Sequence, residues 1–160
     1  MRIAVVSDTH RDSRTLEICK EFVQDYDCFI HLGDNTDDGE YITEDFEGSV
    51  YIVKGNCDYG NKWSKDQVID IEGIRILATH GDMYNVKMGM NNLYYRAREV
   101  EADIVLFGHT HVSCLEEYNG ITFMNPGSIS MPRSSKGGFI GVIELDNGKM
   151  EDIYLEKISQ

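Results

Sequence analysis

Side chains with oxygen or nitrogen donors recur at one kind of place in this sequence, just after a short apolar run. The seven residues in such positions are Asp8, His10, Asp34, Asn56, His80, His109 and His111. Four of the five histidines of the chain are among them. Carboxylate, imidazole and amide donors without thiolates suit Mn²⁺, Fe, Zn²⁺, Ni²⁺ or Mg²⁺. The pattern therefore predicts a metal centre.

The short motifs differ in how much each says alone. "SDTH" and "LGDN" are ordinary helix-cap and turn signals. "GHTH" is more informative, because packing gives no reason for two histidines at i and i+2 after a buried strand. Seven donors exceed the needs of one tetrahedral ion. They fit two ions that share a carboxylate, which in two-metal hydrolytic sites lie about 3.5–4 Å apart.

The fifth histidine, His31, lies inside an apolar run rather than after one. A core or supporting histidine with one hydrogen bond is the favoured interpretation there. We therefore leave it out of the ligand set.

The apolar runs themselves predict the elements that must position these donors. In the first half a strand–helix–strand series with short loops favours a parallel sheet with crossover helices. The expected strands are 2–7, 27–32 and 49–54, with a helix over 13–24 and a weak helix over 41–46. In such an open sheet the carboxyl ends of the strands line a single crevice.

The second half is expected to be mostly β, with hairpins at "EG" and at two Asn-Gly turns. Its expected strands are 67–71, 74–80, 103–108, 113–118, 121–125, 139–145 and 149–158, with one helix over 86–101.

Bulk properties exclude several classes of function. A chain of 160 residues is the size of one domain, taken as residues 1–160. A net charge of −13 disfavours extended nucleic-acid backbones, and no apolar run reaches membrane-spanning length. The first residues read as a strand rather than a signal peptide, so we expect a cytoplasmic protein with four free thiols. Of these, Cys19, Cys28 and Cys114 are expected in the core.

The order of the motifs resembles the calcineurin-like metallophosphoesterase superfamily, and within it the small single-domain phosphodiesterases of bacteria and archaea. The matching blocks are "SDTH", "LGDN", "GNCD", "THGD", "GHTH" and "NPGS". They span Asp8 to Ser128, so the resemblance covers most of the chain. It implies a four-layered α/β/β/α sandwich of two mixed sheets flanked by helices.

The resemblance also implies how the donors divide between two divalent ions. Asp8, His10 and His111 would hold one ion and Asn56, His80 and His109 the other, with Asp34 bridging them. Mn²⁺ is favoured, with Ni²⁺, Fe, Zn²⁺ or Mg²⁺ as alternatives.

A hydrolase mechanism follows from two such ions. A bridging water of lowered pKa would attack phosphorus as hydroxide, so no protein nucleophile is needed. Accordingly, Ser7, Ser128 and Cys57 lack the base and orienting group of a catalytic triad. The residues expected to take part in catalysis are Asp34, Asn56, Cys57 and His80. The substrate would be a small phosphoester, most simply a phosphodiester.

Cys57 stands where much of the superfamily has His, thought to protonate the leaving group. A thiol with an ordinary pKa of about 8.5, pushed towards thiolate by two cations, is a poor proton donor at neutral pH. We therefore expect modest turnover, best on diesters with good leaving groups.

Three other residues have open interpretations. Arg11 and Arg133 are candidates to contact a substrate phosphate or carboxylate, and for each a solvated or surface-paired arginine is an equal alternative. Asp58 could support a ligand or simply shape a turn. Asn125 and Gly127 are expected to shape a loop near the metals rather than do chemistry.

Competing functions are weighed against the full ligand set. A non-catalytic scaffold is the main alternative, since a retromer subunit of this fold has lost part of its ligands. A nuclease is disfavoured by the acidic surface, and a protein phosphatase by the short chain. A homo-oligomer stays open, because Trp63, Tyr84 and Tyr94 suit a partner surface or ordinary core and pocket lining equally well.

Overall fold

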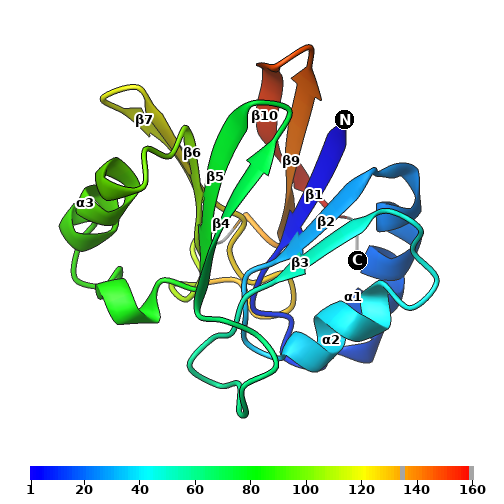
Figure 1. Ribbon diagram of the computed structural model, residues 1–160. Coiled ribbons are helices and arrows are strands. Elements are labelled where there is room, and N and C mark those ends of the chain that lie inside the picture. Colours follow the sequence, from blue (N-terminus) through cyan, green and yellow to red (C-terminus); the bar gives the residue numbers. More distant parts are fainter. Residues whose placement is uncertain (134–135, 159–160) are drawn as a thin grey trace.

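Two five-stranded sheets dominate the computed structural model, which describes residues 1–133 and 136–158 (Figure 1). The first sheet has the order β10-β9-β1-β2-β3 and the second β4-β5-β6-β8-β7. The strands of the first sheet are β1 (Arg2–Val6), β2 (Cys28–His31), β3 (Ser49–Ile52), β9 (Phe139–Asp146) and β10 (Lys149–Lys157). Those of the second are β4 (Asp66–Ile71), β5 (Ile74–Thr79), β6 (Ile104–Leu106), β7 (Cys114–Tyr118) and β8 (Ile121–Asn125).

Both sheets are mixed. In the first, β1, β2 and β3 run parallel, and the hairpin of β9 and β10 adds antiparallel to β1. In the second, β5, β6 and β8 run parallel, and β4 and β7 pair antiparallel at the two edges. The parallel strands of each sheet bring their carboxyl ends to the same edge.

Three clusters of buried side chains show the layers. One lies between the sheets and includes Ile3, Ile30, Ile76 and Leu106. The second joins the first sheet to α1 (Ser13–Phe22) and α2 (Thr36–Ile42), and the third joins the second sheet to α3 (Asn91–Glu99). The order helices, sheet, sheet, helix confirms the predicted four-layered sandwich, with α3 on the opposite side of the molecule from α1 and α2 (Figure 1).

The hairpins are as predicted, but the prediction of a helix over residues 41–46 is wrong. The structure has α2 at Thr36–Ile42, which overlaps the expected helix only at residues 41 and 42. Its N-cap residue Asn35 makes no capping bond with its own side chain. Instead the Asp58 carboxylate accepts from the backbone N–H groups of Asn35 and Thr36. A cap from another part of the chain leaves no local signal.

The helix expected over 86–101 is also shorter, because α3 begins only at Asn91. Before it lie a short 3₁₀ turn at Asp82–Tyr84 and Asn85, whose φ of +52° lies outside the helical region. Val86 is buried in the core against α3 and the second sheet. Because Val86 must be buried there, residues 85–90 form a loop instead of a helix, and the spacing of apolar residues in the sequence does not predict this.

Candidate metal centre

The predicted ligands come from two sheets rather than from one open parallel sheet. Asp8 follows β1 and Asp34 follows β2 in the first sheet, whereas His80 follows β5 and His109 follows β6 in the second. Backbone hydrogen bonds join the loops within each sheet, from Asp8 N to Gly33 O at 3.0 Å and from Gly108 N to His80 O at 3.0 Å. The donors therefore gather where the edges of two packed sheets meet.

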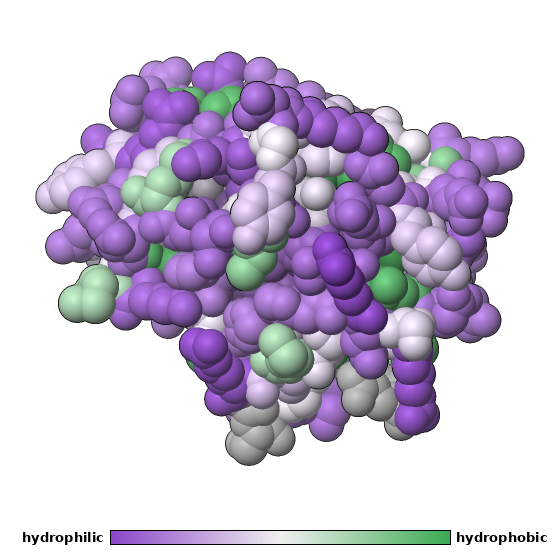
Figure 2. Space-filling model, turned by 90° about the horizontal axis from the view of Figure 1, so that it is seen from below, coloured by the Kyte–Doolittle hydropathy of each residue, from purple (hydrophilic) through white to green (hydrophobic). Residues whose placement is uncertain are grey.

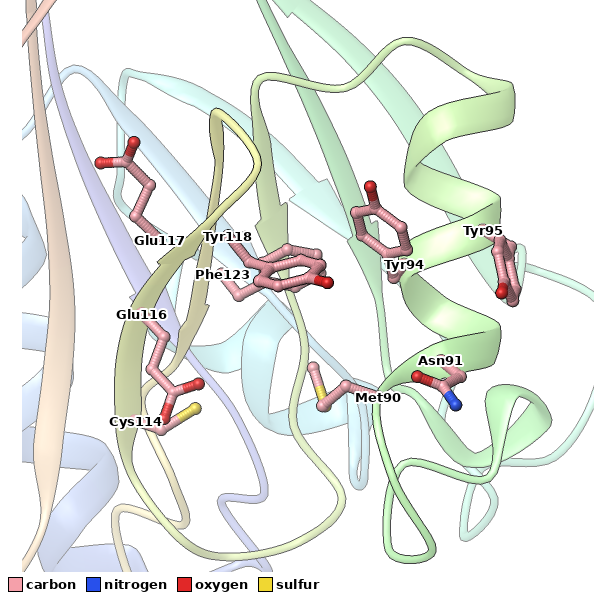
Figure 3. Close-up of a pocket in the computed structure, with 9 residues that line it drawn as sticks. All are labelled: Met90, Asn91, Tyr94, Tyr95, Cys114, Glu116, Glu117, Tyr118 and Phe123. Atoms are coloured by element: carbon pink, nitrogen blue, oxygen red, sulfur yellow. The ribbon is translucent and has the colours of Figure 1, made fainter.

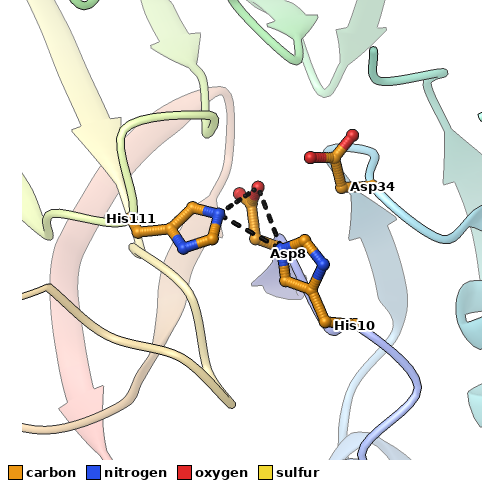
Figure 4. Close-up of side chains that lie close together, drawn as sticks. All are labelled: Asp8, His10, Asp34 and His111. Atoms are coloured by element: carbon orange, nitrogen blue, oxygen red, sulfur yellow. Dashed lines mark hydrogen bonds and ion pairs between the residues drawn. The ribbon is translucent and has the colours of Figure 1, made fainter. Parts of the chain in front are cut away.

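The first cluster of donors contains Asp8, His10, Asp34 and His111 (Figure 4). His111 Nε2 lies 3.1 Å from Asp8 Oδ1 and 3.2 Å from His10 Nε2. Within the described residues, Asp8 Oδ1 is buried and has no hydrogen-bond partner of good geometry. A buried anionic oxygen ringed by imidazole nitrogens is the arrangement that a cation would complete.

The second cluster contains Asp34, His80 and His109, so Asp34 belongs to both. His80 Nε2 lies 3.4 Å from Asp34 Oδ2 and 3.2 Å from His109 Nδ1. In each cluster the donor atoms all lie within 4.8 Å of one another. One carboxylate common to two groups of donors is the geometry expected of a pair of ions.

Backbone carbonyls orient two of these imidazoles. His80 Nδ1 lies 2.8 Å from Leu32 O, and His111 Nδ1 lies 3.1 Å from Met131 O. A carbonyl only accepts, so Nδ1 carries the proton in both rings and Nε2 presents its lone pair to the crevice. A second hydrogen bond of this kind is typical of metal-binding histidines.

The charges of the clusters favour ionised carboxylates. Burial opposes ionisation of Asp8, but the close approach of the His111 and His80 imidazoles and the hydrogen bond from Ser7 Oγ outweigh it and hold its pKa below the usual value. Burial likewise opposes ionisation of Asp34, and the His80 contact together with a hydrogen bond from Cys57 N lowers its pKa. Burial also opposes protonation of His80, yet Asp34 and Asp8 raise its pKa. Among the described residues of the two clusters, the basic groups beside these carboxylates are imidazoles.

The loops that carry the ligands have strained backbones. The φ angles of Asp8, His10, Asp34, His109 and His111 lie between +49° and +69°, in the left-handed region. Residues other than glycine enter this region uncommonly, and such strain collects at functional sites. No sequence signal revealed it.

Two glycines of the motifs are required by close packing. A Cβ on Gly55 would collide with Asp34 Oδ1, and one on Gly108 would collide with Ser7 Oγ and lie 2.7 Å from Asp8 Oδ2. Both carboxylates need the space that these glycines leave empty.

Asp58 supports the site and is more than a turn residue. Its Oδ2 accepts from the N–H groups of Asp34 and Gly55, and its Oδ1 from those of Asn35 and Thr36, all at 2.8–2.9 Å. One carboxylate thus joins the loop after β2 to the loop after β3. Sequence reasoning left this role undecided.

The loop after β8 has the predicted shaping role. Asn125 Nδ2 donates to Gly108 O and Thr110 Oγ1, and Asn125 Oδ1 accepts from Gly127 N. Ser128, whose contribution sequence reasoning missed, donates from Oγ to Asp8 O at 2.7 Å. These bonds hold the "GHTH" loop against the first ligand loop.

Asn56 and Cys57 lie at the open side of the centre, and both are exposed. Asn56 Nδ2 donates to Cys57 Sγ at 3.7 Å, and Cys57 N donates to Asp34 Oδ1 at 3.0 Å. Burial and the Asp34 carboxylate raise the pKa of the Cys57 thiol. The protein's own groups therefore oppose the thiolate that cations are expected to favour.

The two candidate arginines are exposed and held only by their backbones. Arg11 N donates to Asp38 Oδ2, and Arg133 N donates to His111 O. Within residues 1–133 and 136–158, neither guanidinium makes a hydrogen bond or ion pair. Both are free to meet a ligand.

His31 is fully buried beside the centre. Its Nδ1 accepts from Gly33 N, and its Nε2 lies 3.1 Å from Thr9 Oγ1. It makes two contacts rather than the one expected, and it stays outside both clusters of donors. Burial lowers its pKa to about 4, because the charged form would be desolvated.

This burial predicts loss of stability in mild acid. In the unfolded chain His31 binds a proton at about pH 6.5, whereas in the folded protein it stays neutral down to about pH 4. The stabilising contribution of neutral His31 should be fully present above about pH 6.5. The free energy of unfolding should then fall by about 3 kcal/mol as the pH drops from there to about 4. Urea titrations of the metal-free protein at several pH values measure this, with His31→Asn as control. A pH profile that His31→Asn leaves unchanged would disprove the assignment.

Comparison with known proteins decides the family. The calcineurin-like phosphoesterase superfamily domain matches residues 1–148. The chain belongs to this superfamily. It is 34% identical to the probable metallophosphoesterase YsnB of Bacillus subtilis, over 92% of this chain and 86% of that protein. It is 25% identical to the phosphodiesterase MJ0936 of Methanocaldococcus jannaschii, over 98% of this chain and all of that protein.

A solved relative shares the metallophosphoesterase fold. The crystal structure of zinc-bound Vps29 from Entamoeba histolytica superposes with a TM-score of 0.75, covering 99% of this chain and 98% of that one. Its identity of 21% establishes likeness of fold alone. Among the described residues of this metallophosphoesterase, no helix is long and apolar enough to cross a membrane.

Proposed function

We propose that this chain is a metal-dependent phosphodiesterase that acts on a small substrate. The observation that carries the proposal is Asp34, which is common to two clusters of carboxylate and imidazole donors. In the proposed centre Asp34 would be a ligand of both divalent ions. The other ligands are Asp8, His10 and His111 on one side, and Asn56, His80 and His109 on the other.

The residues present suit such ions. Asp8 Oδ1 is buried and lacks a hydrogen bond among the described residues, and His80 and His111 present their Nε2 lone pairs. Mn²⁺ is the metal we favour, with Ni²⁺, Fe, Zn²⁺ and Mg²⁺ as alternatives. The Vps29 protein of similar fold was crystallised as a complex with Zn²⁺.

The chain's own residues would orient the substrate. When bound, two divalent ions supply charge for the phosphoryl oxygens and lower the pKa of a water molecule. The exposed guanidiniums of Arg11 and Arg133 are suited to bind the non-reacting part of the phosphoester. Ser7 and Ser128 are no nucleophiles, because both hydroxyls are buried and donate to Asp8.

The proposal includes the setting of the enzyme. All four cysteines are free, as expected of a chain in the reducing cytoplasm. We propose that residues 1–160 work there as one domain.

A panel of metals and substrates tests the function. The metal-free protein would be loaded with each ion and offered bis(p-nitrophenyl) phosphate, p-nitrophenyl phosphate and cyclic nucleotides. We expect hydrolysis of the diester above the metal-free rate, with Mn²⁺ the best activator. A fully loaded protein that is inert towards every phosphoester would instead favour the non-catalytic scaffold.

Cys57 should limit the reaction. Cys57→His places an imidazole proton donor at this position, so turnover of the diester should rise by about 100-fold, the low end of what general acids contribute, or activity should broaden to monoesters. Cys57→Ala is the matched control and should gain nothing. Steady-state rates on the mono- and diester measure both. Equal rates and equal specificity in the wild type and both variants would show that Cys57 lines the site without taking part in catalysis.

A further inference from the structure

An aromatic groove lies away from the metal centre, between α3 and the hairpin of β7 and β8 (Figure 3). Its cavity volume is about 460 Å³, within the range of small-molecule sites. The side chains that define it are Met90, Tyr94, Tyr95, Glu116, Tyr118 and Phe123. None of them belongs to the proposed centre. Cys114, expected in the core, is only half-buried and lines this groove.

Two tyrosines form a corner in the groove. The rings of Tyr94 and Tyr118 lie 5.1 Å apart at an interplanar angle of 74°. Arg98 Nη1 and Asn119 Nδ2 both donate to Tyr94 Oη at 3.0 Å, which holds that ring in place. Tyr118 is 58% exposed, and Tyr95 beside the corner is 67% exposed. The Tyr94 half of the corner is nevertheless fixed before any ligand binds.

The charged side chains that line the groove are carboxylates. The Glu116 carboxylate lies on the same side of β7 as Tyr118 and faces α3, whereas Glu117 points away (Figure 3). Among the described residues that line the groove, none is lysine or arginine. The Arg98 guanidinium lies at the hydroxyl end of Tyr94, where it donates to Oη, with its Cζ 5.9 Å from the ring centroid. The exposed face of Tyr118 is an aromatic surface of the kind that attracts a cation.

We propose that the groove binds a small organic ammonium ion of the choline type. The negative faces of the tyrosine rings attract an alkylated cation, and Glu116 supplies the opposite charge. An anionic ligand would meet a carboxylate, and a neutral one would gain nothing from it. The site is separate from the phosphodiesterase centre and does not depend on the proposed reaction.

Nuclear magnetic resonance of the tyrosine rings tests the proposal on the full chain. Choline chloride is titrated at constant ionic strength, beside 3,3-dimethylbutan-1-ol, an uncharged molecule of the same shape. We expect saturable shifts at Tyr94 and Tyr118, with choline bound at least about threefold more tightly than the alcohol.

Three variants separate the groove from the general acidity of the surface. Tyr118→Leu keeps apolar bulk without a ring, and Glu116→Gln removes the charge without changing shape; each should weaken choline about threefold. Glu151→Gln, at an exposed position on β10, makes the same charge change elsewhere and should leave the affinity unchanged. Equal affinity for choline and the alcohol, or equal weakening by Glu151→Gln and Glu116→Gln, would overturn the proposal.

Discussion

Asp34→Asn should reduce metal-dependent phosphodiester hydrolysis by more than about 100-fold, which is beyond the loss usual for a residue that merely supports a ligand. The reason is that Asp34 belongs to both clusters of donors, so one substitution weakens both halves of the proposed centre. The amide keeps the shape of the side chain but loses the charge that would hold two cations. Steady-state rates with bis(p-nitrophenyl) phosphate and metal content by mass spectrometry measure the effect.

Asp37→Asn provides the matched control. Asp37 lies three positions further along, on the exposed side of α2, and belongs to neither cluster. This variant has the same change in net charge and should keep its activity and metal content. If Asp34→Asn binds metal and turns over substrate like Asp37→Asn, Asp34 is no shared ligand.

Asp58→Ala should lower the free energy of unfolding by about 3 kcal/mol or more, even in the metal-free protein. Four backbone N–H groups, in two loops, lose their common acceptor. The affinity for metal should also fall by about 10–100-fold, because the loops that carry Asp34 and Asn56 are no longer joined. Urea denaturation and calorimetric metal titration give the two quantities.

Asp103→Ala calibrates this expectation. The Asp103 carboxylate accepts from one backbone N–H, that of Arg75, at 2.8 Å, and Asp103 precedes β6, at the opposite end of this strand from His109. Its loss should cost about 1 kcal/mol and leave metal affinity unchanged. If Asp58→Ala loses no more free energy of unfolding than Asp103→Ala, the four hydrogen bonds of Asp58 together stabilise the fold no more than one does, and the prediction is wrong.

The hairpins were predictable because their signals are local. "EG" between β4 and β5 and the two Asn-Gly turns lie next to the strands that they connect. The superfamily was predictable because its motifs keep their order along the chain. The helix after β2 was missed for the opposite reason. It starts at Thr36 under the carboxylate of Asp58, 22 positions away in sequence, and no local pattern reports a cap of that kind.

By itself the sequence determined which donor groups the protein carries: carboxylates, imidazoles and one amide follow successive strands, and from them we predict a pair of hard or borderline cations. Only the tertiary structure decided how these side chains meet. Two sheets, rather than one, bring the donors together, and Asp34 belongs to both clusters. Left-handed backbones and carbonyls such as Leu32 O aim the ligands. The physical reason is that donor type belongs to each residue, whereas direction depends on contacts between segments far apart along the chain.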